Sequence, residues 1–254
     1  MSKPVCITSG SSSGIGAATA LLFAQRGYDV VVNYSRDKAQ ADEVAGQCRA
    51  AGADVLVLQA DIGDDASCRE MAAQVGKRWG RADALVNNAG RTKFAAARDL
   101  EALSAEDFVD ICRLNVAGIF QLTRAFVPLL QASPNGSVTN VSSIASLTGA
   151  GSSIAYAASK GAVNTLTLSL ARALGPSIRV NAVLPGMVDG VWLRKGMGAE
   201  GFARGAERYR GRAILEDLIQ PVDVAKAIWW LANEADKTTG HLVPVEAGAV
   251  LGKL

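Results

Sequence analysis

Three residues in the middle of the chain, Ser143, Tyr156 and Lys160, have the side chains of an acid–base site. Tyr156 and Lys160 are four residues apart, so on a helix they lie on one face, roughly 6 Å apart along the axis. A phenol with a pKa of about 10 exchanges protons poorly at neutral pH, and a neighbouring ammonium favours its anion. Ser143 is placed to hold a substrate carbonyl against the phenol. The spacing is typical of carbonyl and alcohol chemistry, although it also occurs on ordinary solvated helix faces.

The elements that must position these residues alternate between short β-branched runs and longer helical patterns, which indicates βαβ units and a parallel sheet. The predicted strands are residues 5–8, 29–33, 54–59, 83–87, 137–141, 178–183 and 242–245. The predicted helices are residues 15–26, 38–51, 105–130 and 221–231, one that follows a cap at Asp64 and runs to 79, and one that begins after Ser152 and ends at Gly175. Ser104 and Asp107 are placed like a capping pair for the helix over 105–130. Without any linker or repeat, the pattern predicts a single α/β domain over residues 1–254, a Rossmann-type doubly wound sheet of seven parallel strands flanked by helices.

The composition is that of an ordinary globular protein, with 49% hydrophobic residues, 20% charged residues and a net charge of +2. So small a charge gives no reason to expect nucleic acid or a membrane surface as a partner. The four cysteines and the single histidine show no metal-ligand spacing, so we expect no metal. Because no apolar run is long enough to span a membrane and no signal-peptide pattern is present, we expect a cytoplasmic protein with reduced cysteines.

A glycine-rich turn, residues 10–16, lies between the first predicted strand and the first predicted helix, with the spacing GxxxGxG. Glycines at such a turn let a phosphate approach the main chain and the positive end of a helix. The alternative is an ordinary flexible loop, since glycines are common in loops. The position directly after the first strand favours a dinucleotide-binding turn.

The end of the second strand bears on which dinucleotide binds. An acidic residue there would bind the ribose hydroxyls of NAD, but this chain has Asn33, Tyr34, Ser35 and Arg36. An arginine suits a 2′-phosphate through bidentate, charge-assisted hydrogen bonds. We therefore expect NADP(H), with NAD(H) as the alternative, while a purely solvated Arg36 is the ordinary interpretation of a surface arginine.

Taken together, these features resemble the short-chain dehydrogenase/reductase family, and in particular its 3-oxoacyl-ACP reductases, over essentially the whole chain. The family's motifs occur in the expected order: SGSSSGIG at 9–16, NNAG at 87–90, Asn115 in LNVAG, Ser143, YxxxK at 156–160, PG at 185–186 and VEAG at 245–248. Asp61 with Ile62 matches the acidic position after the third strand. One position departs from the pattern, because the family usually has a threonine shortly after PG where this chain has Gly190.

The resemblance implies a role for each of four catalytic residues. Tyr156 would exchange a proton with the substrate oxygen, and Lys160 would lower the tyrosine pKa and bind the nicotinamide ribose. Ser143 would orient the carbonyl, and Asn115 would hold a water that links Lys160 to solvent. A structural role in bonding backbone is the alternative for Asn115, and Ser142 is expected to be a local strand-end hydroxyl.

The resemblance also implies a set of cofactor contacts, with backbone groups of Val188 replacing those of the family threonine. Besides Tyr156 and Lys160, the expected contacts are Gly10, Ser12, Ser13, Gly14, Ile15, Gly16, Asn33, Tyr34, Ser35, Arg36, Asp61, Ile62, Asn88, Ala89, Gly90, Pro185, Gly186 and Val188.

Residues 187–215 interrupt the alternation, because the segment is rich in glycine and arginine and has poor periodicity. We expect it to form a mobile lid beyond the carboxyl ends of the strands. Its excess of basic residues favours an acidic substrate, such as a carrier-bound acyl group or a carboxylate, or simply keeps the segment solvated. Trp192 and Met197 are expected to form an apolar side of the pocket or to anchor the lid.

The leading hypothesis is an NADP(H)-dependent reductase of a small-molecule ketone, aldehyde or 3-oxoacyl thioester. The alternatives are an NAD-dependent sugar or polyol dehydrogenase and a non-catalytic dinucleotide-binding regulator. The resemblance further implies a homotetramer, for which residues 158–173 and 243–251 are apolar enough to form interfaces or to belong to an ordinary core.

Overall fold

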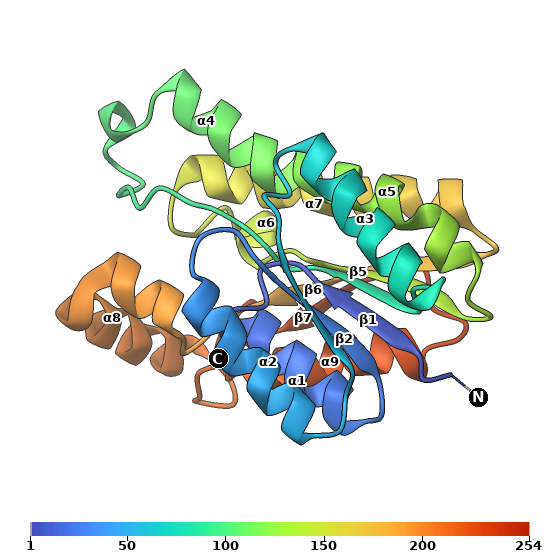
Figure 1. The fold of residues 1–254 in the computed structure, drawn as a ribbon. Coiled ribbons are helices and arrows are strands. Elements are labelled where there is room, and N and C mark those ends of the chain that lie inside the picture. Colours follow the sequence, from blue (N-terminus) through green and yellow to red (C-terminus); the bar gives the residue numbers. More distant parts are fainter. Residues whose placement is uncertain (1, 254) are drawn as a thin grey trace.

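The computed structural model describes residues 2–253 and contains one sheet of seven parallel strands, in the order β3-β2-β1-β4-β5-β6-β7 (Figure 1). The strands are β1 (Val5–Thr8), β2 (Asp29–Tyr34), β3 (Val55–Gln59), β4 (Ala84–Asn87), β5 (Gly136–Val141), β6 (Ile178–Pro185) and β7 (Leu242–Val245). The strand order reverses between β1 and β4, and ligands of open α/β sheets bind at the carboxyl ends of strands at such a reversal. The predicted Rossmann-type, single-domain fold is confirmed.

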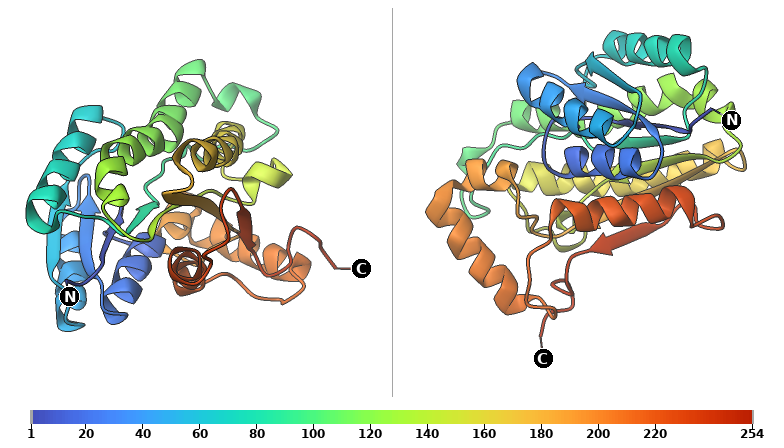
Figure 2. Two further views of the ribbon diagram at one scale, coloured as in Figure 1. Left: turned by 90° about the vertical axis from the view of Figure 1, so that its right-hand side faces the viewer. Right: turned by 60° about the horizontal axis from the view of Figure 1, so that its bottom comes forward.

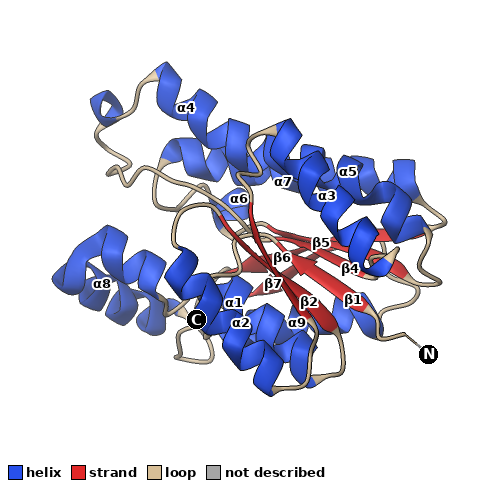
Figure 3. Ribbon diagram, in the orientation of Figure 1, coloured by secondary structure: helices blue, strands red, loops and turns tan. Residues whose placement is uncertain are grey.

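Helices cover both faces of the sheet in three layers (Figure 3). On one face lie α1 (Gly14–Gln25), α2 (Lys38–Ala50) and α9 (Pro221–Asn233). On the other lie α3 (Asp65–Trp79), α5 (Ile119–Gln131) and α7 (Ile154–Leu174). The remaining helices are α4 (Ala105–Cys112), the short α6 (Ala145–Thr148) and α8 (Val191–Arg212), and a single 3-10 turn covers Leu100–Ala102.

Successive residues of each strand enter two different cores, one under each helical layer. Val30 and Val32 pack with α1, α2 and α9, whereas Val31 packs with α3, α5 and α7. Because β2 is buried along its whole length, its run of valines is what a strand covered on both faces requires. The Phe23 ring of α1 meets the Trp229 ring of α9 edge-on at 5.0 Å between centroids, which fixes α9 against α1.

Local signals placed several helix ends correctly. The Asp64 carboxylate accepts the Ser67 N–H at the start of α3, and Ser104 and Asp107 form a reciprocal capping box on α4, both as predicted. The predicted helix over 105–130 is helical, but a π-helical segment at Arg113–Gly118 separates α4 from α5 and contains Asn115. No helix within residues 2–253 is both long enough and apolar enough to cross a membrane.

The poor periodicity of 187–215 gave no prediction of a helix, but the segment is largely helical. Most of this segment is α8, a helix with a single break at Gly198, where φ is 69° and ψ is 165°. Figure 2 shows α8 in two pieces at one end of the molecule, outside the helical layers. Phe202 and Ala206 bury against Leu218, and this contact stabilises a helix whose glycines each cost about 1 kcal/mol relative to alanine.

Candidate active site

Helix α7 brings the phenol of Tyr156 and the ammonium of Lys160 to the carboxyl end of β5. The Ser153 hydroxyl caps the helix by accepting the Tyr156 N–H at 3.2 Å. Lys160 Nζ donates to the carbonyl oxygen of Val141, the last residue of β5, at 2.7 Å, and lies 5.6 Å from the centroid of the Tyr156 ring. Lys160 is only 4% exposed. The four-residue spacing therefore places both groups on one helix face, as the sequence predicts.

Two adjacent serines follow β5, and they have different partners. Ser143 is hydrogen-bonded to the side chain of Tyr156, and its Oγ also accepts the Ala145 N–H at 3.1 Å. The buried Ser142 hydroxyl donates to Asn164 Oδ1 at 2.7 Å, which ties the strand end to α7. The structure thus brings Ser143 to the phenol and leaves Ser142 with the local role expected of it.

The electrostatics of the pair follow from burial. Desolvation raises the pKa of Tyr156 to about 12, with the Ser143 hydrogen bond acting in the opposite direction. Desolvation also lowers the pKa of Lys160 to about 8. Lys160 is not among the causes of this shift, so the structure does not show the lowering of the tyrosine pKa that the resemblance implies for Lys160. Near neutral pH the tyrosine carries its proton.

Asn115 lies in the π-helical segment and is fully buried. Its Oδ1 accepts the Arg91 N–H at 2.8 Å, and its Nδ2 donates to Arg91 O and to Ser159 Oγ, each at 3.0 Å. Ser159 precedes Lys160 on α7. The side chain therefore ties the segment after β4 to the helix that carries the acid–base pair, which is the structural role named as the alternative.

The glycine turn fits a dinucleotide pyrophosphate. A Cβ at Gly16 would overlap the carbonyl oxygen of Gly10 and come within 2.6 Å of Asn88 Nδ2, so only glycine permits this close approach. Gly14 has φ +57° with open space beyond it. No side chain caps α1, unlike α2 and α3, which Asp37 and Asp64 cap. The first amide groups of α1 are therefore available to an anion.

The NNAG segment joins the glycine turn to the acid–base pair. Asn88 Nδ2 donates to Ser9 O at 2.9 Å and to Gly10 O at 3.0 Å. A Cβ at Gly10 would lie 3.0 Å from Ala89 Cα, and a Cβ at Gly90 would lie 3.8 Å from Lys160 Nζ. Four residues thus connect the expected phosphate position to the expected position of the reaction.

Residues at the end of β2 divide into buried and exposed groups. Asn33 is 2% exposed, and its Oδ1 accepts the Gly10 N–H at 2.9 Å while its Nδ2 donates to Ala60 O at 3.2 Å. Its side chain shapes the turn and faces protein. Tyr34 is also buried, whereas Ser35 and Arg36 are exposed. Within residues 2–253, no acidic side chain forms an ion pair with Arg36.

The other expected contacts lie at the same edge of the sheet. Asp61, just after β3, is exposed, and Ile62 beside it is buried. After β6, Val188 forms a parallel bridge with Ile219, in which Met187 O and Asp189 N bond to Ile219. In this geometry the N–H and C=O of Val188 point away from Ile219 and are not used in the bridge.

A cavity of about 540 Å³ adjoins Ser143 and Tyr156. Its lining comes from the loop after β4, from the segment around α6, and from α8 with the residues before it. Phe94 of that loop lines it beside Trp192 and Met197 of α8. The sequence analysis missed Phe94, which belongs to no motif and lies in an irregular segment. Trp192 and Met197 do form an apolar side of this cavity.

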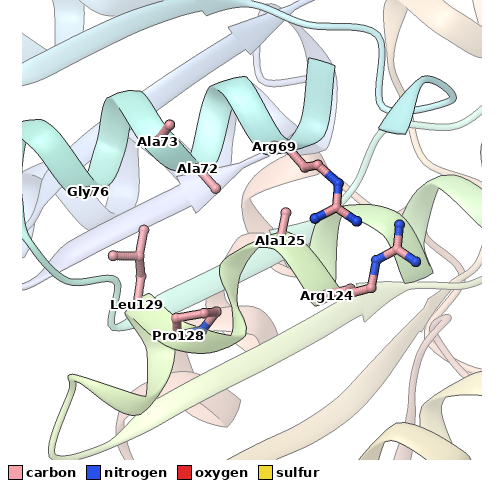
Figure 4. Close-up of a pocket in the computed structure, with 8 residues that line it drawn as sticks. All are labelled: Arg69, Ala72, Ala73, Gly76, Arg124, Ala125, Pro128 and Leu129. Atoms are coloured by element: carbon pink, nitrogen blue, oxygen red, sulfur yellow. The ribbon is translucent and has the colours of Figure 1, made fainter. Parts of the chain in front are cut away.

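A second, shallower groove of about 400 Å³ lies between α3 and α5 (Figure 4). Small side chains line much of it, and Arg69 and Arg124 stand at one end. Both arginines form ion pairs with the same carboxylate, Asp65, which balances one of their two charges. The groove contains none of the motif residues. Across residues 2–253, no cluster of three or more histidine, cysteine, aspartate or glutamate side chains is placed to hold a metal.

Comparisons with known proteins agree with this architecture. The family profile described as enoyl-(acyl carrier protein) reductase matches residues 10–250. A protein named ketoacyl reductase 2 of the granaticin polyketide synthase of Streptomyces violaceoruber is 42% identical over 98% of this chain and 96% of its own. The 3-oxoacyl-[acyl-carrier-protein] reductase of Thermotoga maritima is 33% identical over 97% of this chain and 98% of its own.

Among solved structures, one from Burkholderia xenovorans that is assigned to the short-chain dehydrogenases/reductases superposes with a TM-score of 0.92. It is 45% identical, and the match covers 99% of this chain and 100% of that one. The chain belongs to the short-chain dehydrogenase/reductase family. It is an NAD(P)-dependent oxidoreductase that acts on CH–OH groups and is similar to ketoacyl reductases.

Proposed function

We propose that this protein is an NADP(H)-dependent reductase that interconverts a ketone and a secondary alcohol. Its catalytic residues are Ser143, Tyr156 and Lys160, and Asn115, which is bonded to Arg91 and Ser159, is a positioning residue beside the proton path of Lys160. The observation that carries the proposal is the placement of one protonated phenol, Tyr156, between a hydroxyl and a buried ammonium on one side and an apolar cavity on the other. The NNAG segment connects the glycine turn to the acid–base pair.

The glycine turn and the NNAG segment would hold a dinucleotide, which when bound would supply the hydride for the new C–H bond at the carbonyl carbon. Tyr156 donates its phenolic proton to the carbonyl oxygen, so the C=O double bond becomes an alcohol. A tyrosine that keeps its proton up to a pKa of about 12 is in the right state for this donation at neutral pH. Ser143 holds the carbonyl oxygen against the phenol. Lys160, with a pKa of about 8, returns a proton to the tyrosine along a path that passes Asn115 and solvent.

The preference for NADP(H) rests on the end of β2. Arg36 is exposed and unpaired within the described residues, next to the exposed Ser35. The one acidic neighbour, Asp37, caps α2 by accepting the Gln40 N–H at 3.0 Å, so its carboxylate is engaged away from a ribose. An unopposed guanidinium beside a hydroxyl favours a 2′-phosphate over a free ribose diol.

The test is NADPH oxidation with a panel of uncharged ketones by the wild-type protein and by Tyr156→Phe. We expect the variant to lose about 10³-fold in kcat while its NADPH affinity, followed by fluorescence, stays within about threefold. Ser143→Ala should lose activity at retained stability, whereas Ser142→Ala should lose stability first, because its hydroxyl joins β5 to α7. Dinucleotide binding without turnover of any ketone would indicate a regulator instead.

Two further assignments accompany the proposal. We infer that residues 187–215 act as the substrate lid and that the break at Gly198 is its hinge, since this is the one residue of α8 outside helical geometry. We also infer a homotetramer, because Val109, Phe120 and Leu168 on α4, α5 and α7 are exposed and Leu251 is 83% exposed. Light scattering after gel filtration measures the assembly directly.

A cytoplasmic location is likewise proposed. Cys6, Cys48 and Cys68 are buried free thiols, and the fourth cysteine, Cys112, is also free. A chain with four unpaired thiols suits a reducing compartment. Fractionation of cells that express the protein tests this assignment.

A further inference from the structure

The cavity beside Tyr156 has no charged lining. None of its lining residues is a lysine, arginine, aspartate or glutamate. None of the five arginines of α8 lines the cavity. Arg194 pairs with Asp189 at 2.7 Å and Arg204 pairs with Glu200 at 3.4 Å, while the other three are exposed. The Arg194 guanidinium also stacks over the Phe202 ring at 4.3 Å. An anionic group beside the carbonyl would thus meet an apolar surface and would be costly to desolvate.

Three aromatic rings form a continuous row that begins at the phenol. The Tyr156 and Trp192 rings lie 5.9 Å apart between centroids with an interplanar angle of 45°, and Trp192 and Phe94 lie 5.7 Å apart at 52°. Met187 and Met197 line the same cavity. Trp192 is 47% exposed and Phe94 is 37% exposed, so large apolar surfaces remain uncovered along this row.

A glycine on α8 holds the row together. A Cβ at Gly196 would overlap the ring of Phe94, so the ring can rest on the helix only because that position has no side chain. This contact joins the loop after β4 to α8, two segments about a hundred residues apart in the chain. The first piece of α8 and Phe94 therefore form one packed unit around the cavity.

We propose that the substrate is an uncharged ketone whose carbonyl belongs to a flat, apolar ring system. The ring lies against Trp192 and Phe94 while the carbonyl oxygen reaches Tyr156 and Ser143. Tilted aromatic faces favour a rigid ring, which stacks on them and loses little conformational freedom, over a flexible chain of the same carbon number. The reaction is the one proposed above, in which hydride and proton add across the carbonyl to give the ring alcohol, and the inference rests on that proposed function.

The experiment compares kcat/KM with NADPH for four probes. 2-Tetralone and 2-decanone have the same number of carbons but differ in shape, and methyl acetoacetate and acetoacetate differ in charge. We expect 2-tetralone to exceed 2-decanone by about tenfold or more, and acetoacetate to be the poorest. Equal efficiency on the ring and the chain would overturn the ring preference, and a preference for acetoacetate would overturn the apolar assignment.

Two matched variants link the preference to the aromatic row. Gly196→Ala and Gly211→Ala make the same change on α8, but a Cβ at Gly211 has no atom within 4 Å. We expect Gly196→Ala and Trp192→Ala to lower kcat/KM for 2-tetralone about tenfold more than they lower it for methyl acetoacetate. Gly211→Ala should match the wild type on both. Equal losses on the two ketones would contradict the proposal.

A binding measurement separates this inference from the proposed function. 2-Tetralone is titrated against the protein saturated with NADP⁺, and fluorescence quenching is compared between the wild type and Trp192→Phe. Quenching that disappears in the variant supports the ring site even if no ketone is reduced, in which case only the proposed function fails. Quenching that is unchanged in Trp192→Phe contradicts the ring site whatever the turnover.

Discussion

Two regions are rich in glycine: the turn after β1, here called the dinucleotide side, and helix α8, here called the substrate side. The glycines serve a different purpose in each region. At the turn after β1, Gly10 and Gly14 have positive φ, and Gly16 lies against backbone. On α8, only Gly198 has positive φ, while Gly196 and Gly205 are helical and admit neighbouring side chains. The first set is required by the local path of the chain. The second is required by contacts that form only once distant segments meet.

The largest effect is expected at the dinucleotide turn. In Gly16→Ala, the added Cβ overlaps Gly10 O, a backbone atom that cannot move without shifting the start of α1. We expect NADPH affinity to fall about 100-fold or more and stability to fall by about 1–3 kcal/mol. Gly27→Ala is the control, because it strains a positive φ at the other end of α1 with no atom nearby. Gly27→Ala should lose stability alone, and an equal loss of affinity there would refute the comparison.

Next in size is the loss of the guanidinium at the end of β2. Arg36→Ala should weaken NADPH binding about 10- to 100-fold, the range of a lost charge-assisted hydrogen bond, and leave NADH binding unchanged. Fluorescence titrations with both dinucleotides provide the ratio of affinities. Parallel changes for NADPH and NADH would mean that Arg36 does not contact the 2′-phosphate.

A pH-dependent effect follows from the burial of Lys160. The pKa of Lys160 is lowered from 10.5 to about 8 in the fold, so between about pH 8 and 10.5 the unfolded chain binds the extra proton. Stability relative to Lys160→Met should therefore rise through this window, by about 1–3 kcal/mol. Denaturant unfolding of both proteins at several pH values measures it. A constant difference would show that Lys160 titrates normally.

The smallest effect is expected at the departure from the family pattern. A Cβ at Gly190 meets no atom within 4 Å, and its φ of −153° is open to any residue. Gly190→Thr should add a side-chain cap to α8, which has none, and raise stability by up to about 1 kcal/mol. NADPH affinity should rise no more than about threefold if the backbone groups of Val188, which the bridge to Ile219 leaves unused, contact the cofactor. Thermal unfolding and a cofactor titration test both expectations, and a destabilised variant would contradict them.

The sequence predicted the strands, the helix caps and the acid–base spacing well because their signals are local. Strand alternation, the caps at Asp64 and Ser104, and the spacing of Tyr156 and Lys160 depend on neighbours within a few residues. Asn33 shows the limit of such reasoning. Its position suggested a ligand contact, but its amide bonds Gly10 and Ala60. Position along the chain did not determine where the side chain points.

The substrate side could not be predicted in the same way. Five glycines between 196 and 211 lower the helix propensity of α8, and the helix depends on Phe202 and Ala206 meeting Leu218. Phe94 acquires its place from Gly196, far along the chain. The pKa of Tyr156 is likewise set by burial, which the spacing of residues does not reveal. These features depend on tertiary contacts.

The central claim is that a hydride passes from the dinucleotide to a ketone carbon while Tyr156 supplies the proton. The most direct measurement is a reaction of 2-tetralone with NADPH deuterated at C4 on either face, followed by mass spectrometry of the product. We expect one deuterium on the carbinol carbon with only one of the two singly labelled forms of NADPH. We expect no labelled alcohol from Tyr156→Phe. Oxidation of NADPH without deuterium in the alcohol, or full labelling by the variant, would contradict it.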